Sequence, residues 1–148
     1  MNHTFLLEEA VWDAEGLYSD LTRGVEFRCV AQSTVTHQPH VWTISGEMSL
    51  FSEPPVSFQN TYTVQPYKPE APTLWTSFNP DLGKIQGQFI IEKNIILSTY
   101  ATSDGQLEGQ EKMEQIDPDT YSCVGILGNP GRPLFSWTVT LHRRKNLN

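Results

Sequence analysis

Apolar and polar residues alternate along this chain with a period of two from residue 10 almost to its end. Successive side chains of a β-strand point to opposite faces, so this pattern predicts strands with one buried and one solvated face. Only segment 4–10 has a helical pattern, and we expect a short helical segment there, capped by Thr4. The other segments predict ten strands, at residues 10–20, 25–36, 40–51, 56–65, 72–78, 84–92, 94–102, 105–115, 119–127 and 133–143.

Turn-forming residues separate these strands at short intervals. Asp104-Gly105 is the clearest hairpin signal, and Gly128-Asn129-Pro130-Gly131 is a second turn of the same kind. Short strands joined by tight turns predict an antiparallel meander, which removes its edges when it closes into a barrel. We therefore expect an all-β fold, a single antiparallel up-and-down β-barrel of about 8–10 strands, built by one domain over residues 1–148.

The composition argues against several classes of function. The chain has 148 residues, with ten Lys and Arg against seventeen Asp and Glu, and a formal net charge of −7. Contacts to nucleic-acid phosphates need clustered cations, so we expect no nucleic-acid partner. No apolar run is long enough for a membrane span, and the N-terminus lacks the pattern of a signal peptide, so we expect a cytoplasmic protein.

The cysteines and histidines give no sign of a metal or cofactor site. Cys29 and Cys123 are too few for a disulfide framework, and whether they pair is open. His37 and His40 flank a predicted turn, where two imidazoles alone make an incomplete metal site. No nucleotide-binding, zinc-protease or hydrolase fingerprint occurs, so we expect neither a cofactor nor a metal.

Glycines occur near the middle of four predicted inward faces, at Gly46, Gly87, Gly109 and Gly125. One interpretation is that they leave interior volume unfilled, which gives room for a ligand. The other is that they mark points where a small barrel bends. On the first interpretation, Gly109→Leu should abolish ligand uptake and leave the fold intact.

Two polar residues, Asn60 and Glu111, lie on the same inward faces. A carboxylate there must pair, raise its pKa or meet water, so Glu111 is a candidate ligand anchor or general base. A bulge or a register slip that turned it outward would remove both roles.

Aromatic residues supply the rest of the expected site. The expected ligand-binding residues are Trp42, Gly46, Phe58, Asn60, Tyr62, Phe89, Gly109, Glu111, Tyr121 and Trp137.

The favoured function is binding of a small hydrophobic or aromatic molecule in the barrel interior. The alternative is a cofactor-free isomerase, cyclase or lyase acting on such a molecule, with Glu111 as the acid–base group and Tyr62 or Tyr121 as the proton donor. A third interpretation is a filled barrel whose outer surface binds a protein. Whether the chain is an enzyme is open, and strand 72–78, if it lies at an edge, could pair across a homodimer.

Short segments of the chain resemble the calycin superfamily, which includes the lipocalins and the fatty-acid-binding proteins. Gly16-Leu17-Tyr18 stands where lipocalins have Gly-x-Trp on the first strand, with Trp12 as another packing candidate. Arg143 or Arg144 stands where their last strand supplies an arginine over that aromatic ring. The resemblance implies a barrel that holds a small molecule.

The C-terminal half is similar to the phycobilin lyases, a branch of the same superfamily. The segments that carry this similarity are Ser98-Thr99-Tyr100, Asp104-Gly105-Gln106-Leu107, Glu111 and Ser136-Trp137. The arginine-rich stretch that follows the Glu-bearing strand in that family is replaced here by residues 117–123, which carry no arginine. This departure argues against bilin attachment.

Overall fold

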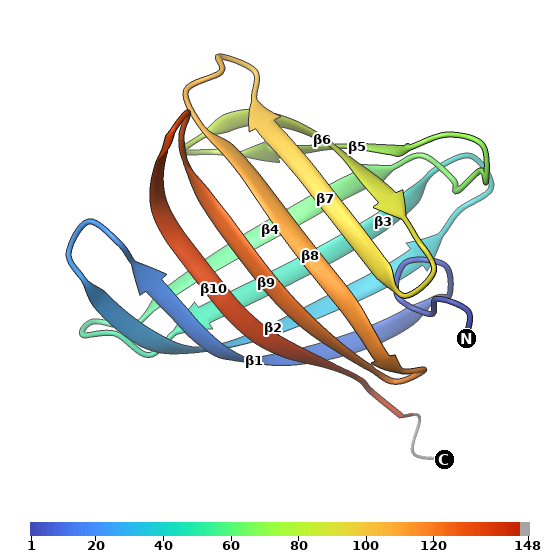
Figure 1. The fold of residues 1–148 in the computed structure, drawn as a ribbon, viewed down its shortest axis with the longest axis horizontal. Helices are drawn as coiled ribbons and strands as arrows, with labels where there is room; N and C mark the ends of the chain where they lie inside the picture. The colour runs from blue at the N-terminus through green and yellow to red at the C-terminus, as the bar shows by residue number, and fades with distance from the viewer. Residues whose placement is uncertain (146–148) are drawn as a thin grey trace.

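Ten β-strands form one closed antiparallel barrel in the computed structural model, which describes residues 1–145 (Figure 1). Each strand pairs with its neighbours in the chain, and β1 pairs with β10 to close the barrel. The expected all-β fold and up-and-down order are therefore confirmed. The strands are β1 (Ala10–Asp20), β2 (Val25–His37), β3 (Trp42–Leu50), β4 (Val56–Val64), β5 (Thr73–Asn79), β6 (Gly83–Ile91), β7 (Ile95–Thr102), β8 (Glu108–Asp117), β9 (Thr120–Asn129) and β10 (Arg132–Arg143).

The helical segment expected at residues 4–10 is wrong. Residues 5–7 form a turn, closed by a hydrogen bond from the Glu8 N–H to the Thr4 carbonyl, and β1 begins at Ala10. Leu6 has a φ of 71°, which lies in the left-handed region and cannot continue a right-handed helix. Within the described residues, no helix is long and apolar enough to cross a bilayer.

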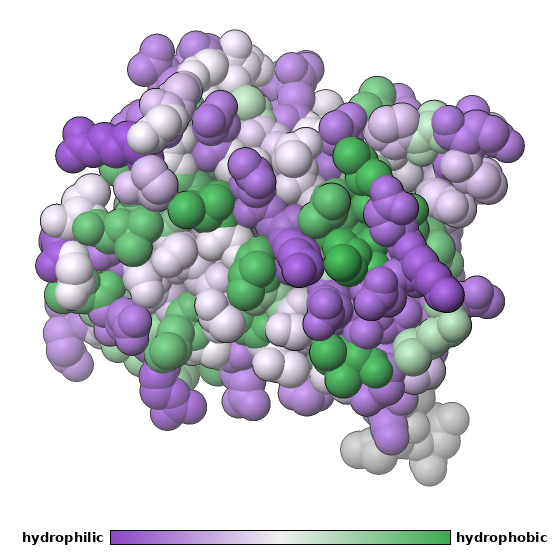
Figure 2. All heavy atoms as spheres, viewed as in Figure 1, coloured by the Kyte–Doolittle hydropathy of each residue, from purple (hydrophilic) through white to green (hydrophobic). Residues whose placement is uncertain are grey.

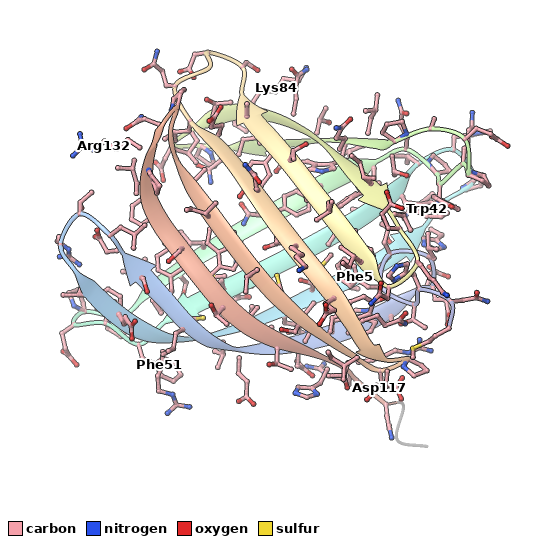
Figure 3. The ribbon with its side chains drawn as sticks, in the orientation of Figure 1. Phe5, Trp42, Phe51, Lys84, Asp117 and Arg132 are labelled. Carbon is pink, nitrogen blue, oxygen red and sulfur yellow. The ribbon has the colours of Figure 1, made fainter. Side chains whose placement is uncertain are left out.

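The strand connections divide the barrel into two ends. The β1–β2, β3–β4, β5–β6, β7–β8 and β9–β10 turns lie at the left and upper left of Figure 1, and we call this the open end. Residues 1–9 lie at the opposite end, on the right, which we call the closed end. In Figure 3, Phe5 and Trp42 mark the closed end, whereas Phe51 and Arg132 mark the open end.

The N-terminal segment seals the closed end with apolar side chains. Phe5 and Leu6 are buried, and Leu6 has no exposed surface. The Phe5 ring packs edge-on against Trp12 and Tyr121, with centroid distances of 5.6 and 6.0 Å, and Trp12 and Tyr121 pack against each other at 5.4 Å. Edge-to-face aromatic contacts of this kind add to the free energy gained from burial alone.

Hydrogen bonds hold the same segment in place. The hydroxyl oxygen of Tyr121 accepts the N–H groups of Thr4 and Phe5, at 3.1 and 3.2 Å. It therefore donates its own proton to Nδ1 of His3 at 2.8 Å, while Nε2–H of His3 donates to the Glu92 carbonyl at 2.7 Å. These four hydrogen bonds pair His3, the Tyr121 hydroxyl and the N–H groups of Thr4 and Phe5, although Nε1 of the neighbouring Trp12 is buried without a partner among the described residues.

One seam of the barrel is much shorter than the others. β4 pairs with β5 over three residue pairs, from Tyr62 to Val64, whereas every other seam has seven pairs or more. The inward-facing Val56 and Phe58 at the start of β4 are 39% and 38% exposed. The barrel is thus accessible to solvent at this end. β5 itself is paired on both sides, so the expected edge at residues 72–78 is not an edge, and a homodimer stays a prediction.

Candidate functional site

Glu111 lies at the middle of β8 on the inward face, between Gly109 and Met113. Its carboxyl oxygen Oε2 accepts a hydrogen bond of 2.7 Å from Nε1–H of Trp137 on β10. The carboxyl group is buried in the barrel interior. The inward orientation expected from the alternation is therefore observed, and no register slip turns this carboxyl outward.

The surroundings of Glu111 disfavour its charged form. Burial raises the pKa of the Glu111 carboxyl above its ordinary value of 4.5, and hydrogen bonds from Trp137 and the Cys123 thiol only partly offset this effect. Burial also raises the pKa of Cys123, and the neighbouring Glu111 raises it further. The thiol is therefore held protonated as a weak donor beside the carboxyl, not as a nucleophilic thiolate.

Two groups of aromatic rings lie on either side of Glu111. The first group is at the open end, where Tyr18 stacks on Trp137 with an interplanar angle of 7° and a centroid distance of 6.2 Å. Phe58 and Phe135 lie 6.4 and 5.8 Å from the same Tyr18 ring. Burial raises the pKa of Tyr18 to about 12, so its hydroxyl is a donor throughout the physiological range.

The second aromatic group is centred on Trp75 of β5. Tyr62, Tyr100 and Phe89 lie 4.8, 5.6 and 6.0 Å from the Trp75 ring. Burial raises the pKa of both Tyr62 and Tyr100, and in each case the charge of Glu111 adds to the effect. Tyr100 lies over Gly109, two residues before Glu111 on β8, so the interior combines one acid with neutral hydroxyl donors.

The inward face of β5 carries three buried polar atoms without a hydrogen-bond partner among the described residues. They are Oγ1 of Thr73, Nε1 of Trp75 and Oγ of Ser77. These side chains are only 3–5% exposed. A buried polar group without a partner costs about 1–3 kcal/mol, and such groups are rare unless water or a ligand completes them. The inward face of β5, the strand next to the exposed Val56 and Phe58 of β4, therefore has hydrogen-bonding capacity that the protein itself does not use.

Three of the four mid-strand glycines do not leave empty volume. Trp75 lies over Gly87, Tyr100 over Gly109 and Trp137 over Gly125, each from the neighbouring strand. A Cβ atom at any of these glycines would overlap the ring. The glycines are spaces for aromatic rings, as in aromatic rescue of strand glycines. Gly109→Leu would therefore displace Tyr100, and the expectation that it leaves the fold intact is wrong.

Gly46 is the exception among these glycines. A Cβ added there would meet nothing nearer than Oγ of Ser33 at 3.6 Å, which is ordinary van der Waals contact. Gly46 is half-buried and pairs with Asn60 of β4. Of the four positions, it alone fits the first interpretation, that of unfilled interior space.

The expected site residues are distributed along the length of the barrel. Gly46, Asn60, Tyr62, Glu111 and Trp137 lie away from the ends of their strands, on the inward faces. Phe58 lies at the open end, while Phe89 and Gly109 belong to the Trp75 and Tyr100 group. Trp42 lies at the closed end, stacked on His37 at 3.8 Å. The hydroxyl of Tyr121 is bound to the N-terminal segment, so the structure does not bring it to Glu111.

Four residues of the interior were missed by the sequence reasoning: Tyr18, Ser77, Tyr100 and Cys123. Trp75 is one of the aromatic residues that the sequence offers as pocket lining, but it is not among the expected site residues. Apolar residues occur on both faces of the strand that contains Trp75, so the alternation does not show whether its side chain points inward or outward. Tyr100 and Trp75 could have been predicted from Gly109 and Gly87, the glycines that they cover. A glycine in the middle of a strand has no side chain, so a large side chain on the neighbouring strand fills the space.

A surface groove lies on the outside of the barrel. It has a volume of about 730 Å³ and crosses β5 to β9, over the outward residues Leu74, Gln88, Thr99, Gln110 and Ile126. A second, smaller groove on β7, β8 and β9 is lined by Leu97, Val124 and Glu111. Figure 2 shows apolar patches in green separated by polar side chains in purple on this view of the barrel. The larger groove offers amides and aliphatic side chains. It is the surface that the protein-binding interpretation would use.

The described residues contain no cluster of three or more His, Cys, Asp or Glu side chains suited to a metal ion. Cys29 and Cys123 are buried free thiols. Burial raises the pKa of Cys29, as it does that of Cys123, which makes both thiols poor nucleophiles.

We expect Glu111→Gln to change how stability depends on pH. A carboxyl whose pKa is raised on folding favours the folded state below its unfolded pKa, and this contribution is lost as pH rises through the folded pKa. The wild-type free energy of unfolding should therefore fall as pH rises above 4.5, by up to about 1.4 kcal/mol for each unit of the shift. Urea denaturation across this range should give a flatter curve for Glu111→Gln.

The control for this experiment is Glu108→Gln, which removes the same charge from the exposed face of the same strand. Its curve should run parallel to that of the wild type. Parallel curves for Glu111→Gln as well would show that Glu111 titrates as an ordinary solvated carboxylate.

Comparison with known proteins adds little to this description. No protein-family model matches the chain, and no curated protein matches it. Among solved structures, it is similar to a crystal structure from Nitrosomonas europaea described provisionally as AttH, with 13% sequence identity and a TM-score of 0.34. The match covers 91% of this chain and 50% of that chain, so this chain spans about half the length of that protein. Membership of the calycin superfamily stays a prediction, whereas the closed ten-strand barrel rests on the chain's own strand pairing.

Proposed function

We propose that this chain binds a small, largely apolar or aromatic molecule inside the barrel, between the open end and Glu111. The observation that carries the proposal is the contrast between the two halves of the interior. Inward-facing residues of the closed half are sealed by residues 1–9, whereas Phe58, Tyr18 and Trp137 keep exposed surface. Binding pockets have this composition, a mainly apolar wall with a few placed polar groups.

The polar groups of the interior support the same function. Ser77 and Trp75 have buried atoms without partners, and two further polar side chains lie on the inward face, Asn60 beside Gly46 and Glu111 beside Gly125. Unpartnered buried atoms also occur at the closed end, at Nε1 of Trp12 and Oε1 of Gln115, so those of β5 support the proposal only together with the exposed Phe58 on the neighbouring strand. A ligand that enters from the open end would complete their hydrogen bonds.

The test uses Gly46→Leu, which adds an isobutyl group on the inward face at the one of the four mid-strand glycines where an added Cβ overlaps no neighbour. We expect wild-type protein to bind N-phenyl-1-naphthylamine, a neutral apolar fluorophore, with enhanced emission. Gly46→Leu should weaken this binding at least about tenfold, a change of about 1.4 kcal/mol, because the added side chain occupies the ligand's volume.

The matched control is Ser45→Leu, which adds the same side chain one residue away on the exposed outer face of β3. This variant should bind the fluorophore as the wild type does. Equal weakening by both variants, or no binding by wild-type protein, would contradict an interior site. Weakening by Ser45→Leu alone would favour the outer surface.

The second candidate function is acid–base catalysis in the same interior. It is favoured by one observation: Glu111 has a raised pKa and lies near the phenols of Tyr62 and Tyr100. A carboxyl with a raised pKa can donate a proton nearer neutral pH than an ordinary one. On this hypothesis, mass spectrometry should detect a converted product of a bound molecule with wild-type protein, and Glu111→Gln should bind that molecule unchanged.

A further inference from the structure

The basic residues of the chain leave Glu111 without a counter-ion. The chain has ten Lys and Arg, and nine of them are exposed. Arg143 is the half-buried one, and it forms ion pairs with Glu8 at 3.2 Å and Asp119 at 3.8 Å, at the closed end. Within residues 1–145, no cation lies on the inner wall beside the Glu111 carboxyl.

This charge distribution decides which ligands the interior can accept. An anion, such as a fatty-acid carboxylate, would meet Glu111 with no basic side chain to pair with, and like charges at low dielectric repel strongly. A cation would instead supply the partner that the carboxyl lacks. The net charge of −7 acts in the same direction, because it raises the local concentration of cations around the protein.

The aromatic rings around the carboxyl favour the same kind of ligand. Trp137 donates a hydrogen bond to Glu111 and is nearly parallel to Tyr18. Tyr100 lies over Gly109, on the same strand as Glu111, and contacts Trp75, as does Tyr62. The faces of Trp and Tyr rings attract cations, most strongly where water is excluded. A flat ligand can also stack against these rings.

The unpartnered atoms of β5 supply neutral hydrogen bonds beside this charge site. Oγ of Ser77 and Oγ1 of Thr73 can each accept a proton from an N–H group, and both are almost fully buried. Ser77 pairs with Tyr62 across the β4–β5 seam, and Thr73 pairs with Phe89, so both hydroxyls face the aromatic group around Trp75. An ammonium ion or a protonated nitrogen heterocycle has the donors that these oxygens lack.

We propose that the interior site takes a flat aromatic molecule that carries a positively charged nitrogen, with the nitrogen at Glu111 and the ring between the two aromatic groups. This inference rests on the proposed function, because it names the class of ligand for the same site. Such a site prefers cations, whereas a barrel that binds carboxylates prefers anions. Glu111 determines the specificity for charge, and Trp137 positions the carboxyl through its hydrogen bond.

The test compares three probes with one naphthalene ring and different charges, near neutral pH. They are 1-naphthylmethylamine, which is a cation, 1-naphthalenemethanol, which is neutral, and 1-naphthoate, which is an anion. Calorimetric titration of wild-type protein should give the tightest binding for the amine, about tenfold tighter than for the alcohol, and the weakest for the naphthoate. In Glu111→Gln, the amine and the alcohol should bind within about threefold of each other, with the affinity for the alcohol unchanged.

Glu108→Gln is again the matched control, since it removes one negative charge from the outer face of β8 and should keep the full preference for the amine. Two outcomes would overturn the inference alone: binding of the alcohol at least as tightly as the amine by wild-type protein, or an unchanged preference in Glu111→Gln. In both cases binding of the neutral probe leaves the proposed function standing. Failure of all three probes and of N-phenyl-1-naphthylamine would contradict the proposed function as well.

Discussion

Gly125→Ala should destabilise the barrel by roughly 3 kcal/mol, although it adds only one methyl group. The new Cβ would overlap the Trp137 ring, so the indole must move. When it moves, Glu111 loses the hydrogen bond to its Oε2 atom, and a buried carboxyl is left with one donor fewer. Urea denaturation would measure the loss of stability, and tryptophan emission of the folded variant should shift to longer wavelength.

Gly46→Ala is the control, because it makes the same change where no atom lies within 3.6 Å of the new Cβ. Its free energy of unfolding should stay within about 1 kcal/mol of the wild type, with a gain expected from the less flexible unfolded chain. Similar effects of the two substitutions would mean that Gly125 does not hold the Trp137 ring in place.

Phe5→Ala should cost about 3–5 kcal/mol, the usual range for removal of a buried phenylalanine ring. Phe5 contacts Trp12 and Tyr121, and its N–H donates to the Tyr121 hydroxyl. Loss of the ring opens a cavity at the closed end and weakens the attachment of residues 1–9. Thermal denaturation would measure the change, and limited proteolysis should then cleave the N-terminal segment faster than the rest of the chain.

Leu17→Ala serves as the comparison, since Leu17 points outward from β1 and is 44% exposed. It should change stability by less than about 1 kcal/mol. If Phe5→Ala behaves like Leu17→Ala, the N-terminal segment only rests on the barrel and does not seal it.

The fold could be predicted because its signals are local. Alternation along β1 or β10 needs only neighbouring residues, and the hairpin at Asp104-Gly105 needs only two. In the structure Gly105 has a φ of 73°, which is the conformation that glycine adopts more easily than other residues in a tight turn. The strand bounds therefore lie within three residues of those expected.

The site was only partly predictable because its geometry depends on which residues face each other across strands. Alternation placed Glu111 inward correctly, but it could not show that Trp137 would reach its carboxyl or that Tyr100 would cover Gly109. Tyr121 shows the same limit. Its side chain points inward and is buried, as the alternation predicts. Its hydroxyl, however, forms hydrogen bonds with residues 3–5, which lie more than a hundred positions earlier in the chain.

The pairing of rings with glycines has a consequence for the kinetics and entropy of binding. The rings of Trp75, Tyr100 and Trp137 each pack directly on the backbone of a glycine. These rings therefore already occupy defined positions before a ligand binds. A molecule that stacks on them loses little entropy in ordering the protein, which is the advantage of preorganisation. The rate of association should then depend on passage through the open end, beside Phe58 and the short β4–β5 seam, and hardly on rearrangement of the wall.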